Sequence, residues 1–210
     1  MSDEAQLEKL ARQIVACKKC ELHHSRKNAV PGEGPTQAEI MFIGEGPGAR
    51  EDEQGRPFVG ASGKFLDQLL EQAGVTRADV WITNVVKCRP PGNRDPLPHE
   101  VETCTSNYLQ HQIKLVNASI IVTLGRFSMG LFFKGAKITQ IHGQMRKVED
   151  RFVIAMYHPA AALHQIALKS TIMADFAQLP ELLKEARAEL GKSSSKGKEP
   201  KKKKKMNRSK

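Results

Sequence analysis

The segment that decides the fold is IMFIGEGPGAREDEQGRPFVG, residues 40–60. Four large apolar residues run directly into a glycine-rich loop, as happens where a buried strand of a parallel sheet ends. The loop lacks both the Gly-Lys-Ser/Thr ending of a P-loop and the G-x-G-x-x-G spacing of a dinucleotide loop, and its four acidic residues would repel phosphate. It therefore predicts either a tight structural turn or a backbone that approaches a flat, neutral ligand.

Three more segments of the same kind follow along the chain. The four apolar runs, each short and rich in β-branched or aromatic residues, span residues 38–44, 80–87, 119–125 and 152–158. Helical patterns lie between and after them, at residues 62–74, 98–113, 127–133 and from 180 onward. This alternation predicts an α/β fold with three α/β/α layers around a central four-stranded parallel sheet. Residues 144–150 are a candidate hairpin or edge strand.

The net charge of +10 is unevenly distributed over the 210 residues. Residues 191–210 carry ten Lys or Arg and one Glu, a net charge of +9, which leaves +1 for residues 1–190. We therefore expect one domain at residues 1–190 and a disordered, lysine-rich tail at 191–210. The tail is rich in Ser, Gly and Lys, and a segment of this composition cannot bury enough apolar surface to become ordered. The tail is either a solubilising or localising terminus or a tether that attracts a phosphate backbone.

The chain shows no targeting or membrane segment. It has no run of about 18 apolar residues that would span a bilayer, and its N-terminus is charged from the third residue, unlike a signal peptide. We expect a cytoplasmic protein, associated with the nucleoid if the source is prokaryotic.

Four cysteines form a pattern typical of a metal site. Cys17 and Cys20 make a C-x2-C pair, and Cys88 and Cys104 stand alone. Disulfides are not expected in a reducing compartment. Structural zinc usually takes two close pairs, whereas a cubane cluster accepts one pair and two separated thiolates. The spacing favours a [4Fe-4S] cluster over zinc or unrelated buried thiols. The metal would anchor the loop that leaves the second strand at Cys88.

Polar side chains lie at the ends of two of these strands, which is where ligands bind in such sheets, and an aromatic residue lies in the segment GRPFVG after the first strand. Asn84 lies in an apolar strand and needs a partner, either the edge of a pyrimidine or a neighbouring loop. His158 follows the last strand, where it can polarise a carbonyl, donate to an anion or simply belong to the core. Phe58 is either a core residue or a platform on which a planar ligand stacks.

The segments GEGPGAREDEQGRPFVG, ITNVVKCRPPGNRDPLPHE and YHPAAAL, together with the four cysteines, closely resemble the family-4, iron-sulfur uracil-DNA glycosylases over about residues 10 to 185. The resemblance implies a monomeric enzyme that flips uracil out of single- or double-stranded DNA and hydrolyses its N-glycosidic bond, initiating base excision repair. Two alternatives remain. One is an iron-sulfur protein that recognises or traps uracil without turnover, and the other is an enzyme acting on free deoxyuridine nucleotides.

The resemblance also implies roles for individual residues. Uracil would be bound by Glu45, Gly46, Pro47, Phe58, Asn84 and His158. Catalysis would depend on His158 facing O2, Asn84 reading O4 and N3, and Glu45 holding a water, since Gly46 stands where better-known uracil-DNA glycosylases carry an aspartate. The cluster would be bound by Cys17, Cys20, Cys88 and Cys104.

The same resemblance implies a DNA-binding rim. Leu163 would wedge into the base stack, and Lys87, Arg89 and Arg94 would contact the phosphate backbone. His164 takes the place of an arginine that is common in the family, and Glu51 is a candidate guard against the thymine methyl group. The loop CRPPGNRDP lacks the Arg-rich insertion of the covalently trapping relatives, which disfavours trapping.

Overall fold

Parallel strands form the centre of the molecule in a computed structural model that describes residues 1–196. The strands are β1 (Ile40–Gly44), β2 (Trp81–Asn84), β3 (Ile120–Leu124), β4 (Met145–Val148) and β5 (Arg151–Met156). Their order in the sheet is β2-β1-β3-β5-β4. The four predicted parallel strands are confirmed. The sheet nevertheless has five strands, because the candidate edge segment forms β4, which pairs antiparallel to β5.

Eleven helices connect and cover the strands in the described part of the chain. They are α1 (Asp3–Val15), α2 (Leu22–Ser25), α3 (Ala49–Gln54), α4 (Ala61–Gln72), α5 (Pro98–Cys104), α6 (Gln110–Val116), α7 (Arg126–Phe132), α8 (Ile138–Ile141), α9 (Pro159–His164), α10 (Leu168–Ala177) and α11 (Leu179–Lys196). A π-helical stretch, Thr105–Leu109, joins α5 to α6.

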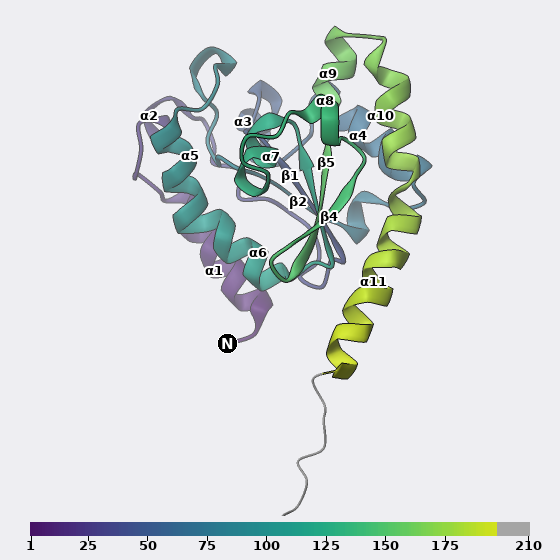
Figure 1. Cartoon of the computed structure of the whole chain (residues 1–210). Coiled ribbons are helices and arrows are strands. Elements are labelled where there is room, and N and C mark those ends of the chain that lie inside the picture. Colours follow the sequence, from purple (N-terminus) through teal and green to yellow (C-terminus); the bar gives the residue numbers. More distant parts are fainter. Residues whose placement is uncertain (197–210) are drawn as a thin grey trace, which may run out of the picture.

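Two apolar cores make the predicted three layers, because successive side chains of a strand point to opposite faces. Ile40 and Phe42 of β1 pack with α4, α10 and α11, where the Phe42 and Phe176 rings stack 6.0 Å apart. Met41 and Ile43 pack on the other face with α1 and the α5–α6 segment. Figure 1 shows the two groups of helices on either side of the sheet.

Strand register brings the tips of β1 and β2 level, with Gly44 opposite Asn84. Beyond the tips the chains stay joined, since Val85 N–H donates to Gly44 O at 3.0 Å and Val86 N–H donates to Glu45 O at 3.1 Å. The glycine-rich loop and the segment after β2 therefore lie side by side at the carboxyl end of the sheet.

Helix α11 extends through residues 191–196, which had been predicted to belong to a disordered tail. An established helix can propagate through residues that would not start one. Residues 197–210, the remainder of the predicted lysine-rich tail, lie outside the described residues. In Figure 1 α11 ends far from α9, near the end of the sheet where the strands begin. Within residues 1–196, no helix is both long enough and apolar enough to cross a membrane.

Candidate active site

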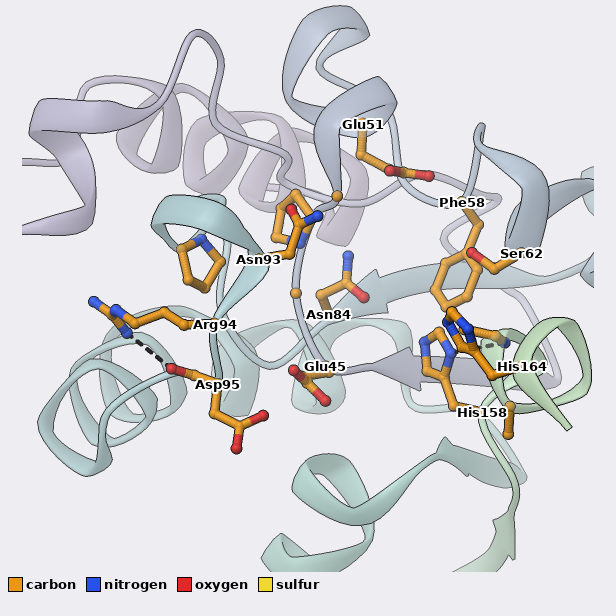
Figure 2. Close-up of a pocket in the computed structure, with 16 residues that line it drawn as sticks. Glu45, Glu51, Phe58, Ser62, Asn84, Asn93, Arg94, Asp95, His158 and His164 are labelled. Carbon is orange, nitrogen blue, oxygen red and sulfur yellow. Dashed lines mark hydrogen bonds between the residues drawn. The ribbon is translucent and has the colours of Figure 1, made fainter.

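A pocket of about 570 Å³ opens at the carboxyl ends of the parallel strands. It is lined by Glu45, Gly46, Pro47, Gly48, Glu51, Phe58, Ser62, Asn84, Pro90, Asn93, Arg94, Asp95, His158, Ala160, Ala161 and His164. Figure 2 shows how the side chains converge from several loops. The structure thus brings together all six residues predicted to bind uracil, and their roles remain predictions.

Asn84 closes the inner end of the pocket. Its side chain is buried, and its Oδ1 atom has no hydrogen-bond partner within the described residues. A Cβ atom on Gly44 would lie only 2.4 Å from that oxygen, so glycine is required opposite it. An unpaired buried amide oxygen costs about 1 to 3 kcal/mol, which favours a bound ligand that supplies the missing donor.

Phe58 forms one wall in a strained backbone conformation with φ of +50°, which is uncommon for a residue with a side chain. Arg77 stabilises this conformation by donating through Nη1 to Phe58 O at 3.0 Å. Helix α4 packs so closely that a Cβ on Gly63 would lie 1.9 Å from Phe58 O. The ring of Phe58 therefore has a fixed position over Gly44.

His158 is the N-cap of α9, and its Nδ1 accepts a hydrogen bond from Ala160 N–H at 3.1 Å. Because Nδ1 accepts, the proton of the neutral ring lies on Nε2. Burial lowers the pKa of His158 to about 4, although the nearby Glu51 opposes this shift. The ring stacks against Phe58 with centroids 5.5 Å apart. His158 is thus a neutral N–H donor at physiological pH.

Glu45 is half-buried, and burial raises the pKa of its carboxyl group. Asp95 raises this pKa further, whereas Arg126 lowers it. Asp95 forms an ion pair with Arg126 of α7. A carboxylate with a raised pKa is a stronger base than an ordinary one, which suits Glu45 to accept a proton from water.

Glu51 shapes the pocket through the backbone. Its buried Oε1 accepts hydrogen bonds from Val59 N–H at 2.9 Å and Gly60 N–H at 2.8 Å. These bonds fix the loop that carries Phe58. The role of Glu51 as a guard against thymine remains a prediction.

The predicted DNA-binding residues lie in different settings. Leu163 is exposed on α9 next to the pocket-lining His164. Arg89 is half-buried, and its Nε donates to Asn93 Oδ1 at 2.8 Å. Arg94 forms a two-point ion pair with Glu100 at 2.8 and 2.9 Å, which leaves it less available to phosphate than predicted.

The prediction that Lys87 contacts DNA is wrong, because this side chain is buried. Its Nζ donates to Thr83 Oγ1 at 2.7 Å, Asn84 O at 2.6 Å and Gln112 Oε1 at 2.7 Å, which uses all three of its N–H bonds. Burial lowers the pKa of Lys87 to about 7, against the opposing effect of Cys104 and Cys88. Lys87 therefore joins the Asn84 strand to α6.

The four cysteines gather at the outer edge of the second core. All four are free thiols, and Cys88 and Cys104 are buried. Burial raises the pKa of Cys20, Cys88 and Cys104, and it raises that of Cys104 to about 11. In each of the three, the negative charge of another cysteine raises the pKa further. The thiols are thus neighbours, as predicted.

Nitrogen donors surround the sulfur atoms. Arg26 donates through Nη1 to Cys88 Sγ at 2.9 Å and through Nη2 to Cys17 O at 2.8 Å. Lys19 N–H lies 3.5 Å from Cys17 Sγ. Within residues 1–196 no three His, Cys, Asp or Glu side chains are already arranged to hold a metal ion. The donor set, four thiols with cationic and N–H partners in an apolar setting, fits an anionic iron-sulfur cluster.

Sequence reasoning missed several residues that line or adjoin the pocket, among them Ser62, Asn93, Asp95 and Arg126. Two signals could have identified some of them. Asn93 and Asp95 lie in a Pro/Gly-rich loop soon after a strand, and Arg126 directly follows Gly125 at the tip of β3. The rule that ligands bind at strand tips applies to β3 as well.

Comparisons with known proteins agree with this geometry. The family description that matches residues 31–178 is that of the uracil DNA glycosylase superfamily. The chain is 45% identical over 185 residues to a type-4 uracil-DNA glycosylase of Archaeoglobus fulgidus, covering 84% of this chain and 92% of the relative. It is 47% identical over 186 residues to the type-4 enzyme of Sulfurisphaera tokodaii, covering 84% of each. A third, from Saccharolobus solfataricus, is 45% identical over 189 residues, covering 84% of this chain and 86% of the relative. The chain therefore belongs to the uracil DNA glycosylase superfamily and, within it, to the type-4 uracil-DNA glycosylases.

Proposed function

We propose that this protein removes uracil from DNA by hydrolysing the bond between N1 of the base and C1′ of the sugar. The observation that carries the proposal is the unpartnered Oδ1 of buried Asn84, in the same pocket as the neutral His158 ring. Family membership supports the same reaction.

Base selection follows from the hydrogen-bonding pattern of an amide. Uracil N3–H donates to Asn84 Oδ1, and uracil O4 accepts from Asn84 Nδ2. Cytosine offers a bare N3 and an amino group at these positions, so both contacts would be lost. Phe58 provides the surface on which the flat ring stacks.

His158 stabilises the leaving group. When the N1–C1′ bond breaks, its electron pair leaves with the base, and negative charge spreads onto O2. The Nε2–H of neutral His158 donates to that oxygen, and a fixed donor of this kind is worth about 3 kcal/mol, or roughly a hundredfold in rate. The bond strengthens as charge develops, so it acts on the transition state.

The target base must leave the duplex, because its N1–C1′ bond is inaccessible in a stacked helix. We assign Leu163, exposed on the pocket rim, as the wedge that fills the space left by the flipped base. Arg89 is assigned to the phosphate backbone. The substrate is single- or double-stranded DNA bound by one copy of the chain. The protein would act in the cytoplasm, associated with the nucleoid if the source is prokaryotic.

Cys17, Cys20, Cys88 and Cys104 would bind a [4Fe-4S] cluster. Such a cluster, when bound, supplies a structural link and a redox-active centre. The thiols would join the segment after α1 to the segment after β2 and to the C-terminus of α5. Since Cys88 lies four residues beyond Asn84, the link would fix the chain that leaves the pocket.

A labelled oligonucleotide with one uracil tests the function. Strand breakage after alkali, at the uracil position only, is expected for hydrolysis. A gel-stable protein–DNA adduct would indicate trapping instead, and activity only on free deoxyuridine nucleotides would overturn the assignment to DNA. Asn84→Ala and His158→Ala should reduce breakage about a hundredfold or more. Arg187→Gln should not, because Arg187 of α11 pairs with Glu39 just before β1, at the opposite end of the sheet from the pocket.

A further inference from the structure

An exposed ion pair lies at the mouth of the pocket. Asp95, on the loop after β2, pairs through Oδ2 with Arg126 Nη2 at the start of α7. Their side chains are 60% and 65% exposed. The Arg126 guanidinium also lies 4.7 Å from the centre of the Phe127 ring, which orients it. Asp95 itself lines the pocket.

Asp95 and Arg126 both act on Glu45. The Glu45 carboxyl is half-buried, and these two residues are the charged groups that alter its pKa, Asp95 upward and Arg126 downward. The other titratable or charged groups in the pocket are His158 and His164 of α9, Glu51 of α3 and Arg94 on the loop. Figure 2 shows Glu45 and Asp95 in the same part of the pocket, with Phe58 and His158 on the other side.

This arrangement separates two kinds of chemistry. The base-reading groups, Asn84, Phe58 and His158, lie together, and two carboxyl groups lie beside them. During hydrolysis the sugar becomes cationic while the base becomes anionic. Carboxyl groups stabilise a developing sugar cation and hold a water that attacks it.

We propose that Asp95 is a second catalytic carboxylate, which together with Glu45 holds the attacking water, and that Arg126 masks Asp95 until a DNA phosphate takes the guanidinium. The inference rests on the proposed uracil-DNA hydrolysis and adds two residues to it. The water oxygen bonds to C1′ as the N1–C1′ bond breaks. One water proton passes to Glu45 and then to solvent, and the uracil anion takes up a proton from solvent.

The exchange of partners at Arg126 is energetically accessible. An exposed ion pair contributes little net stability, so little is lost when Asp95 releases the guanidinium. A DNA phosphate can accept two N–H bonds from the planar guanidinium, as a carboxylate does. DNA binding would thereby unmask a carboxylate at the moment when the flipped nucleotide arrives.

Two variants and a matched control test this. Asp95→Asn removes the carboxylate, Arg126→Gln removes the guanidinium, and Arg187→Gln breaks another exposed ion pair, with Glu39 just before β1 at the opposite end of the sheet. Each full-length protein is assayed for single-turnover excision, for kcat/KM against pH, and for DNA affinity against salt.

We expect Asp95→Asn to reduce the single-turnover rate at least tenfold without weakening DNA binding. The acid limb of kcat/KM should move to lower pH, because loss of the negative charge favours ionised Glu45. Arg126→Gln should weaken binding, reduce the salt slope by about 1, and move the acid limb to higher pH. Arg187→Gln should leave rate and limb unchanged. Glu45→Gln should abolish the limb in every background.

The role of the pair would be overturned if the acid limb stayed in place in both variants, or if it moved to higher pH in Asp95→Asn and to lower pH in Arg126→Gln. An unchanged rate in Asp95→Asn would overturn the catalytic role, and an unchanged salt slope in Arg126→Gln would overturn phosphate capture. These failures are distinct from failure of the proposed function, which would be seen as absence of excision by the unaltered protein.

Discussion

The replacement of Gly44 by alanine tests whether the pocket depends on close approach of three chain segments. The backbone of Gly44 lies outside the left-handed region, so alanine adds no torsional strain and the effect is purely steric. The new Cβ would lie 2.4 Å from Asn84 Oδ1 and 2.7 Å from Phe58 Cζ. Carbon contacts normally settle at about 3.5 to 4.0 Å, so Asn84 or Phe58 must move by about 1 Å.

Both expected effects can be estimated. Overpacking of this kind costs about 1 to 3 kcal/mol, and a domain of this size loses about 2 to 4 °C in Tm per kcal/mol. Activity should fall much more steeply, since a misplacement of about 1 Å in a catalytic site can cost about a hundredfold in rate. Single-turnover excision of uracil and a thermal melt of the same preparation measure the two quantities.

Gly130→Ala is the matched control. Gly130 lies in α7, and nothing stands within 4 Å of the position that its Cβ would take. Alanine is preferred to glycine in a helix by about 1 kcal/mol, so this variant should melt at or above the unaltered protein and excise uracil equally well. If Gly44→Ala retained both Tm and rate, the proposed contact between Asn84 and the tip of β1 would be refuted.

Three further predictions concern the buried polar groups and the thiols. The pKa of His158 is lowered to about 4, against an ordinary value of about 6.5, so the unfolded chain binds the proton more readily. The contribution of His158 to the free energy of unfolding should be complete above about pH 6.5 and should fall by about 3 kcal/mol as the pH falls toward 4. Denaturant titrations at several pH values should show this loss. In His158→Gln this pH-dependent part of the free energy of unfolding should be absent. Lys87→Met should destabilise the protein by about 3 kcal/mol in urea unfolding, because Thr83, Asn84 and Gln112 lose their shared donor; an unchanged urea midpoint would contradict the network. Cys88→Ser should lose the visible absorption of an iron-sulfur cluster and should melt at a lower temperature. Full iron and sulfide content in this variant would contradict the proposal that Cys88 binds the cluster.

The parallel strands were predictable because each is a continuous apolar run, which only burial on both faces explains. The positions of Asn84 and His158 followed from the rule for strand tips. The prediction for Lys87 was wrong because a lysine beside a strand end is normally exposed. One of its three hydrogen-bond acceptors, Gln112, lies 25 residues away in the sequence, so the sequence pattern near Lys87 does not indicate its burial. The pair between Asp95 and Arg126 depends on loops from β2 and β3, which flank β1 in the sheet. Only the strand order, which single-sequence patterns do not supply, brings them together.

The structure also explains why the loop after β1 is acidic. Val59 and Gly60 present N–H groups just before α4, a position at which other proteins bind phosphate. Here Glu51 occupies both donors from within the chain. Asp52 Oδ1 accepts a hydrogen bond from Lys27 N–H at 2.9 Å, and Glu53 forms an ion pair with Arg50.

Of the four acidic residues, Glu51, Asp52 and Glu53 are paired with groups of the chain itself, and Glu45 and Glu51 line the pocket. A nucleotide phosphate cannot displace Glu51 without releasing the segment that holds Phe58 in its strained conformation. The loop is therefore closed to an anion and open to a neutral ring. In a phosphate-binding loop the backbone amides before the helix donate to the ligand, whereas here they donate to Glu51. This difference in hydrogen-bond acceptor separates a phosphate-binding loop from a base-binding loop.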